Sequence, residues 1–412
     1  MKKLLALVLA LMMVTAALPG LAAGATGSTE NQTEEPRTEE PQVSAEDAAL
    51  TEADNQNLNA SYTRVINALK AEDYEAAKEY ISICFAYCDR QSNPVYFADL
   101  LLKRACIDVI EKKTDMALMN LAAALRVRPD MAEAYYIRMQ IYNEAGETDL
   151  AIRDVEKYIE LSQDSAAYND LALLQEAKGD YEAAQAAFEK FAQANGATED
   201  EINFQNAVYQ MRAGKLEEAI TAFEAYTGHE TLGPGALFYI GACKLDLADY
   251  AGAAEAFTAC EEKGGIYEGL YYYRGLSYYY IAKYAEAEAD FLKSLEAEPA
   301  IEDAEYYQAL CKLYEGDYEA AKTMLTAYID KQAAAAEAGN GAAVNYGAYF
   351  YRALCRSLLE DTEGAVADYT TCIENGFELR QSYYERAALY EKLGDTEKQN
   401  ADLDSFLKLS NP

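Results

Sequence analysis

The sequence predicts an all-α solenoid built from about ten helix-turn-helix repeats. The segment Gly179–Ala184 returns with the same six residues as Gly316–Ala321, and weaker copies surround both. Most copies follow one another at 33 to 35 residues, with two longer intervals of 40 and 44. A fixed period near 34 indicates one helical hairpin per copy, which buries its apolar face only against its neighbours. The last residue of each copy is Ala77, Ala117, Ala151, Ala184, Ala219, Ala253, Ala287, Ala321 and Ala365, and Gln399 takes this place in a tenth copy.

The first 25 residues have the pattern of a signal peptide. Lys2 and Lys3 give a basic start, Leu4–Leu18 is an apolar run, and Ala23–Ala25 offers the small residues at which a signal peptidase cuts. We expect cleavage before Thr26 and an exported protein, either secreted or associated with the cell envelope. The apolar run is short for a membrane span, and its retention as an uncleaved anchor is the alternative. No second apolar span follows, so we expect no integral membrane span in the mature chain.

Two further segments complete the predicted organisation. Residues 26–56 are rich in Glu, Thr, Pro, Gln and Ala with few large apolar residues, which predicts a disordered acidic linker. Residues 57–412 form the repeat array. Its last helix, over residues 395–408, carries Gln399 and Asn400 where other copies have small or apolar residues. We interpret this helix as a polar cap on the end of the array.

The composition excludes several classes of function. The formal charge is −35, and removal of two lysines and no acid with the signal peptide makes it −37. This charge opposes binding to nucleic acid or anionic membranes. No phosphate loop, nucleophile motif or metal-ligand spacing is present, and the single histidine, His229, stands alone in a turn. We therefore expect no catalytic residues, cofactor or metal, and no enzyme. Three of the eight cysteines, Cys84, Cys260 and Cys372, fall where the repeat needs a small residue. We interpret the cysteines as small core side chains and expect free thiols rather than disulfides.

A repeated Arg–Asp couple is a second internal pattern. Position 7 of the repeat is Arg in six copies, and position 23 is Asp in four of these, sixteen residues further on. The two positions face each other across the hairpin, which predicts an ion pair in each of the four copies. We interpret the pairs as structural, and an arginine cluster that binds a ligand carboxylate is the alternative. The couples are Arg138 with Asp154, Arg274 with Asp290, Arg352 with Asp368, and Arg386 with Asp402.

These residues resemble the tetratricopeptide repeat (TPR) family. In the copy that runs from Tyr271 to Pro299, the residues at positions 4, 8, 11, 20, 24 and 32 are Tyr271, Gly275, Tyr278, Ala287, Phe291 and Pro299. The resemblance covers about 350 residues and implies a right-handed superhelix. The eighth copy departs from the pattern by a ten-residue insertion near residues 331–343. We expect the insertion to lengthen the second helix of that copy.

The resemblance also suggests where a partner would bind. In this family, positions 2, 5, 9 and 12 of the first helix line the concave face, and position 5 is aromatic in eight of the ten copies. The alternative is that these rings only pack on one another. The residues that we expect to contact a partner are Phe238, Tyr272, Leu276, Tyr279, Tyr280, Tyr306, Leu310, Leu313, Tyr314, Phe350 and Tyr384. They predict a scaffold that holds a protein or peptide partner in an aromatic groove, and the rival function is a module that binds cell-wall glycan.

Overall fold

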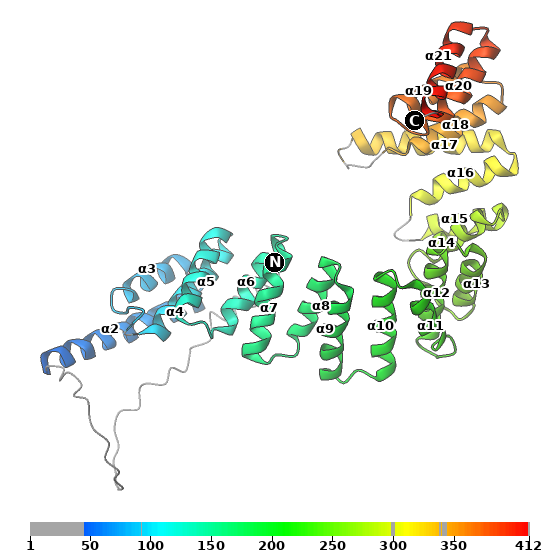
Figure 1. Ribbon diagram of the computed structural model, residues 1–412. Coiled ribbons are helices and arrows are strands. Elements are labelled where there is room, and N and C mark those ends of the chain that lie inside the picture. Colours follow the sequence, from blue (N-terminus) through cyan, green and yellow to red (C-terminus); the bar gives the residue numbers. More distant parts are fainter. Residues whose placement is uncertain (1–44, 92, 298–300, 338, 340–343, 411–412) are drawn as a thin grey trace. The chain divides into compact units, whose positions relative to one another are not determined.

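Helical hairpins make up all the regular structure that the computed structural model describes (Figure 1). The described residues are 45–91, 93–297, 301–337, 339 and 344–410. They form twenty α-helices and no strand, which confirms the predicted all-α solenoid. The predicted signal peptide and the first part of the linker lie outside the described residues. Within the described part, no helix is long and apolar enough to cross a membrane.

The chain divides into two compact units, Met1–Ile202 and Asn203–Pro412. Within each unit, an even-numbered helix (helix A) packs against the odd-numbered helix that follows it (helix B), and helix B packs against the next helix A. The helices of the first unit are α2 (Ala45–Lys70), α3 (Tyr74–Cys84), α4 (Pro94–Ile110), α5 (Thr114–Val127), α6 (Ala132–Glu144), α7 (Thr148–Ser162), α8 (Ala167–Lys178) and α9 (Tyr181–Ala194).

The second unit holds most of α10 and all later helices. They are α10 (Glu199–Arg212), α11 (Leu216–Glu224), α12 (Gly233–Asp246), α13 (Tyr250–Glu262), α14 (Leu270–Tyr280), α15 (Tyr284–Glu296), α16 (Asp303–Glu315), α17 (Tyr318–Glu337), α18 (Tyr346–Leu358), α19 (Thr362–Glu374), α20 (Leu379–Leu393) and α21 (Thr396–Ser410).

The nine alanines that mark the repeats are all completely buried. Each lies early in helix B, where only a small side chain lets helix A come close. A glycine of helix A shows the same close approach of the two helices. A Cβ atom added at Gly275 would lie 2.8 Å from the ring of Phe291 on helix B. The register predicted from the period is therefore confirmed, and the hairpin interior is packed to contact.

In some hairpins the turn between the helices is a Gly-Asp pair. Gly179 and Gly316 have φ angles of +84° and +87°, a left-handed conformation that glycine adopts without a Cβ clash and that ends helix A. The carboxylates of Asp180 and Asp317 accept hydrogen bonds of 3.1 Å from the amides of Ala183 and Ala320. These N-caps satisfy amides that have no partner within helix B.

Ion pairs join the two helices in the four predicted hairpins. In each, Nε and Nη2 of the arginine donate to the two carboxylate oxygens of the aspartate at 2.6–2.9 Å. Three of the arginines also reach helix B of the preceding hairpin through Nη1: Arg274 to Glu261, Arg352 to Thr326 and Arg386 to Thr370. The couples are thus structural, as predicted, and they tie neighbouring hairpins together.

Three helices can be compared with the boundaries and character predicted for them. Helix α2 begins at Ala45, so the assignment of residues 45–56 to a disordered linker was wrong. Helix α17 has 20 residues against 13 in α15 and α19, which confirms that the insertion lengthens this helix B. Helix α21 forms over the predicted cap. Its exposed side includes Leu407 and Leu409, however, so it is less polar than expected.

Candidate partner-binding surface

Successive helices A of the second unit touch one another directly. Helix α14 contacts α12 and α16, and α16 contacts α18, although a helix B separates each pair along the chain. Side chains from consecutive repeats therefore meet on one face. Tyrosines dominate this face in the middle of the unit.

We name the seven tyrosines that α14, α16 and α18 bring together the tyrosine cluster. The ring centroids of Tyr279 lie 5.6 Å from Tyr307 and 5.9 Å from Tyr314. Tyr306 lies 6.3 Å from Tyr351. Most of these contacts are edge-to-face or tilted, the arrangements that aromatic rings prefer. The members of the cluster are Tyr272, Tyr279, Tyr280, Tyr306, Tyr307, Tyr314 and Tyr351.

Two rings of the cluster are open to solvent. Tyr280 is 50 % exposed and Tyr314 is 49 % exposed. Each stacks on a tyrosine at the start of the preceding helix B, with centroids 4.5 Å apart for Tyr250–Tyr280 and 5.3 Å apart for Tyr284–Tyr314. The two stacked pairs stand 34 residues apart in sequence, one per repeat. Because stacking covers one face of each exposed ring, the other face is available to a ligand.

Burial keeps the hydroxyls beneath these two rings protonated. It raises the pKa of Tyr307 to about 12, helped by the neighbouring Tyr280 hydroxyl. It raises the pKa of Tyr351 to about 12 as well, helped by Tyr314. The pKa values of Tyr272, Tyr279 and Tyr306 are raised for the same first reason. The five hydroxyls with raised pKa values thus stay uncharged well above neutral pH.

Five of the eleven residues predicted for the groove belong to the cluster, and two others were wrong. Tyr272, Tyr279, Tyr280, Tyr306 and Tyr314 come together as described. Leu310 and Leu313 are 2 % and 5 % exposed, so they cannot contact a partner and are corrected to core residues. They lie in the hydrophobic core formed by α16, α17 and α18, where neighbouring helices cover them.

The other four predicted residues lie outside the cluster. Phe238 on α12 is covered by the ring of Tyr267 at 5.0 Å. Leu276 is half-buried beside the core around Phe291. Phe350 packs on Tyr369 at 5.5 Å, and Tyr384 on α20 remains exposed beside Phe406 at 5.3 Å.

Sequence reasoning missed the tyrosines at position 6 of the repeat. Tyr307 and Tyr351 belong to the cluster, yet the residues predicted for the face stand at positions 5, 9, 12 and 13 of the repeat. A signal was present: Tyr239, Tyr273, Tyr307 and Tyr351 recur at 34, 34 and 44 residues, in step with the repeat. The same holds for the stacking partners Tyr250 and Tyr284.

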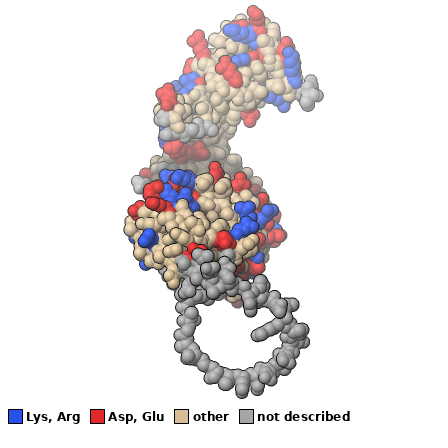
Figure 2. Space-filling view, turned by 90° about the vertical axis from the view of Figure 1, so that its left-hand side faces the viewer, with Lys and Arg blue, Asp and Glu red and all other residues tan. Residues whose placement is uncertain are grey.

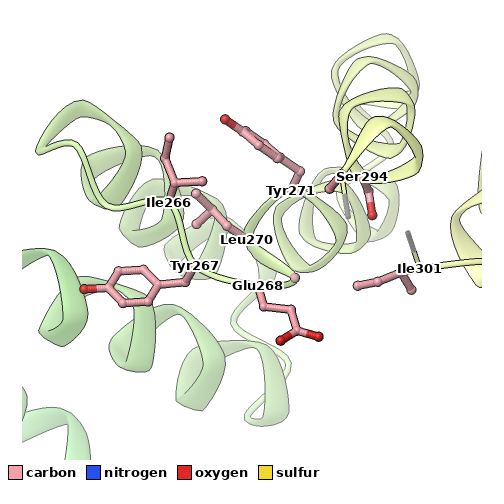
Figure 3. A pocket seen from close by; sticks show the side chains of 9 residues that line it. Ile266, Tyr267, Glu268, Leu270, Tyr271, Ser294 and Ile301 are labelled. Carbon is pink, nitrogen blue, oxygen red and sulfur yellow. The ribbon is translucent and has the colours of Figure 1, made fainter. Parts of the chain in front are cut away.

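A second feature of the same unit is a hollow between hairpins, shown in Figure 3. Its volume is about 250 Å³. Ile266 and Leu270 line one side and Ser294 and Ile301 the other, with Glu268 at the rim (Figure 3). Ile266 is one of the most exposed large apolar residues of the chain. Among the described residues that line the hollow, Glu268 carries the one carboxylate.

Three other features of the described residues bear on function: possible metal ligands, the surroundings of the histidine and the distribution of basic side chains. The described residues include no group of three or more His, Cys, Asp or Glu side chains placed to hold a metal ion. The Nδ1 atom of His229 accepts hydrogen bonds of 3.2 Å from the amides of Thr231 and Leu232 at the start of α12. On the face drawn in Figure 2, basic side chains lie beside acidic ones, so this face offers no continuous basic surface for nucleic acid.

Comparisons with known proteins agree with this architecture. Family models described as "Tetratricopeptide repeat" match residues 113–166, 165–198, 204–264 and 303–333. A curated relative, DnaJ homolog subfamily C member 3 of Gallus gallus, is 31 % identical over 115 residues. That match covers 28 % of this chain and only 21 % of the relative, so the chain spans about a fifth of the relative's length.

Solved repeat structures resemble the chain more distantly. A tetratricopeptide repeat protein from Parabacteroides merdae has a TM-score of 0.42 at 18 % identity, over 60 % of this chain and 93 % of its own. The C-terminal part of a TPR repeat-containing protein from Cytophaga hutchinsonii has a TM-score of 0.43 at 19 % identity, over 58 % and 94 %. The assignment rests on the family models and on the register of the buried alanines. The chain belongs to the tetratricopeptide repeat proteins, whose repeats indicate a protein–protein interaction scaffold.

Proposed function

We propose that this chain is an exported scaffold that binds a segment of a protein partner on the tyrosine cluster of α14, α16 and α18. The observation that carries the proposal is the pair of half-exposed rings, Tyr280 and Tyr314. Tyrosine is enriched at interaction hot spots because it combines a large apolar area with a hydrogen-bonding hydroxyl. The rings stand one repeat apart and are held in place by stacking. Binding of a ligand that covers both therefore costs little free energy for ordering these side chains.

Capture of a partner tests this function. The tagged chain is used to isolate bound proteins from the envelope fraction of the producing cell, with identification by mass spectrometry. We expect Tyr280→Ala with Tyr314→Ala to abolish recovery of the partner, since each lost hot-spot ring weakens binding by about 2 kcal/mol or more. Both rings are half in solvent, so circular dichroism should still show a folded helical protein.

A matched control removes exposed apolar side chains elsewhere. Leu292 on helix α15 and Leu173 on α8 are about as exposed as the two tyrosines. Leu292→Ala with Leu173→Ala should leave recovery intact. Equal recovery by the tyrosine variant and the parent would refute the cluster as the site. Binding of the chain to cell-wall fragments, with no protein partner recovered, would favour the glycan-binding alternative.

Export is tested separately by the N-terminus of the protein purified from the producing cell. We propose that the signal peptide is removed before Thr26, on the strength of the basic start, the apolar run and the small residues at 23–25. Sequencing should give Thr26 as the first residue in the secreted or envelope fraction. A chain that retains Met1 would show that the segment is kept as an anchor or is not a signal.

A further inference from the structure

We propose that the segment bound at the tyrosine cluster is basic, with Lys or Arg side chains directed at Asp303 and Glu378. This inference rests on the proposed function and adds the chemistry of the partner. It follows from which charges around the cluster are already paired and which are free.

The cations on the helices of the cluster are all engaged by carboxylates of this chain. Arg274 on α14 holds Asp290 and Glu261. Lys312 on α16 bridges Glu288 and Glu315. On α18, Arg352 pairs with Asp368, and Arg356 pairs with Asp361 and Asp368. An acidic partner segment would therefore have to break an existing ion pair to find a cation on α14, α16 or α18.

Two acids beside the cluster are in the opposite situation. Asp303, the first residue of α16, accepts a hydrogen bond of 3.2 Å from the Tyr328 hydroxyl. Glu378 immediately precedes α20 with a φ angle of +42°, a left-handed conformation that is uncommon for a residue with a side chain. Both residues are exposed, and no described Lys or Arg forms an ion pair with either.

The two acids affect different members of the cluster. The charge of Asp303 contributes to the raised pKa of Tyr272 and Tyr307. The charge of Glu378 contributes to the raised pKa of Tyr351. The formal charges that influence these hydroxyls are thus negative, and a bound cation would find both carboxylates unpaired.

The exposed ring faces suit the same ligand. An ammonium or guanidinium group over an aromatic ring gains about 0.5–2 kcal/mol, more as the pair becomes desolvated. Tyrosines of this chain already hold cations in this way, as with Lys293 at 4.7 Å from the ring centroid of Tyr271 and Arg352 at 5.3 Å from that of Tyr349. The net charge of −35 also speeds the approach of a basic segment.

Three labelled peptides test the inference on the full chain. They are four repeats of Lys-Leu-Pro, Gln-Leu-Pro and Glu-Leu-Pro, which share their apolar residues and an extended, proline-rich backbone. Fluorescence anisotropy at physiological salt should show that the Lys peptide binds about tenfold more tightly than the Gln peptide, with the Glu peptide weakest.

Variants then separate local recognition from general attraction. Asp303→Asn with Glu378→Gln should weaken the Lys peptide by about fivefold or more and leave the Gln peptide unchanged. The matched control is Glu262→Gln with Glu374→Gln, which removes two exposed negative charges at the ends of helices B α13 and α19. The control should change the affinity for the Lys peptide by less than about twofold.

Each result decides the inference. Equal weakening by both variants would mean that only the net charge attracts the peptide, and equal affinities of all three peptides would mean that charge plays no part. Either result would overturn the basic-partner inference, as would an absence of binding by the Lys peptide. The scaffold function is judged separately, by the variant Tyr280→Ala with Tyr314→Ala. It would still stand if this variant lost recovery of the cellular partner, or lost binding of those peptides that the parent binds.

Discussion

Arg274 and Asp290 form a two-pronged ion pair across a hairpin, with Nε to Oδ2 at 2.6 Å and Nη2 to Oδ1 at 2.8 Å. The two residues are 5 % and 4 % exposed, and Nη1 of the arginine is held by Glu261. An aspartate this deeply buried depends on its partner, because an unpaired buried charge is far less stable than a paired one.

We therefore expect Arg274→Leu alone to destabilise the protein more than Arg274→Leu combined with Asp290→Ala. The single change leaves a buried carboxylate without its cation, and the expected coupling between the two sites is about 1–3 kcal/mol. Urea unfolding of the parent, both single variants and the double variant gives this coupling. The exposed pair Lys178–Asp149 is the control and should show much weaker coupling. Additive losses at Arg274 and Asp290 would contradict the role assigned to the pair.

A second prediction concerns Gly275 on α14. Replacing a glycine within a helix by alanine usually stabilises the helix. Here, however, the added Cβ would lie 2.8 Å from the Phe291 ring. We expect Gly275→Ala to destabilise the protein by about 1–3 kcal/mol through overpacking. Adding Phe291→Leu should recover part of this loss, although Phe291→Leu alone leaves a cavity and destabilises the parent. Thermal unfolding of the four proteins checks the sign, and a stabilising Gly275→Ala would refute the close packing.

The parts of the fold that follow from the period could be predicted from sequence. The alanine spacing fixes which face of helix B meets helix A, and the Arg–Asp spacing of sixteen residues follows from the antiparallel hairpin. The start of α2 could not be found in this way. Residues 45–56 have one large apolar side chain, Leu50, which suggested a linker, but their four alanines favour a helix and they extend the helix that follows.

The candidate surface could be predicted only in part, because it depends on how neighbouring helices A lie against each other. Leu310 and Leu313 occupy positions assigned to the open face, yet α16 is in direct contact with α14 and α18, and the two leucines are covered there. The tyrosines one residue away at position 6 complete the cluster instead. The position of a residue in the repeat predicts which side of its own helix it lies on. Whether its side chain is exposed depends on how the neighbouring repeats pack.

Buried thiols and tyrosines should make the protein unstable at alkaline pH. Burial raises the pKa of Cys243, Cys260 and Cys355 to about 11 and of Cys311 and Cys372 to about 12, from 9.0. A group with a raised folded-state pKa contributes its full stabilisation below its unfolded pKa and loses it as pH rises toward the folded value. The loss should begin near pH 9 and amount to about 1 kcal/mol for each thiol at pH 10. Above pH 10, the tyrosines with raised pKa values add to it.

The thermal unfolding midpoint should therefore fall steadily between pH 8.5 and 10.5 at constant ionic strength. Cys260→Ala with Cys372→Ala removes two of the titrating groups, so this variant should show a shallower fall than the parent. All eight thiols are buried and free, and they should react with a thiol reagent completely only after denaturation. A midpoint that stays constant over this range, or fewer than eight reactive thiols in the unfolded protein, would contradict the assignment.

The insertion in the eighth repeat should be dispensable for folding. Deletion of residues 333–342 returns the interval between Ala321 and Ala365 from 44 to 34 residues. It keeps Gln332, whose side chain donates to the Tyr328 hydroxyl at 2.9 Å and accepts from the amide of Asn345 at 2.9 Å. Because this bond holds residues 332 and 345 close together, the two residues left between them can span the gap at about 3.3–3.6 Å per residue.

We expect the deleted protein to keep its helical circular dichroism and to unfold within a few degrees of the parent, since most of the described side chains removed are exposed. The matched control deletes residues 328–337, also ten residues, and removes the buried Tyr328 and Ile329 from the core of the hairpin. That deletion should lower the unfolding midpoint strongly. Equal damage by the two deletions would mean that the stretch after Gln332 contributes to the fold as much as the core of α17. A folded 333–342 deletion that no longer captures the partner would instead place the insertion at the binding surface.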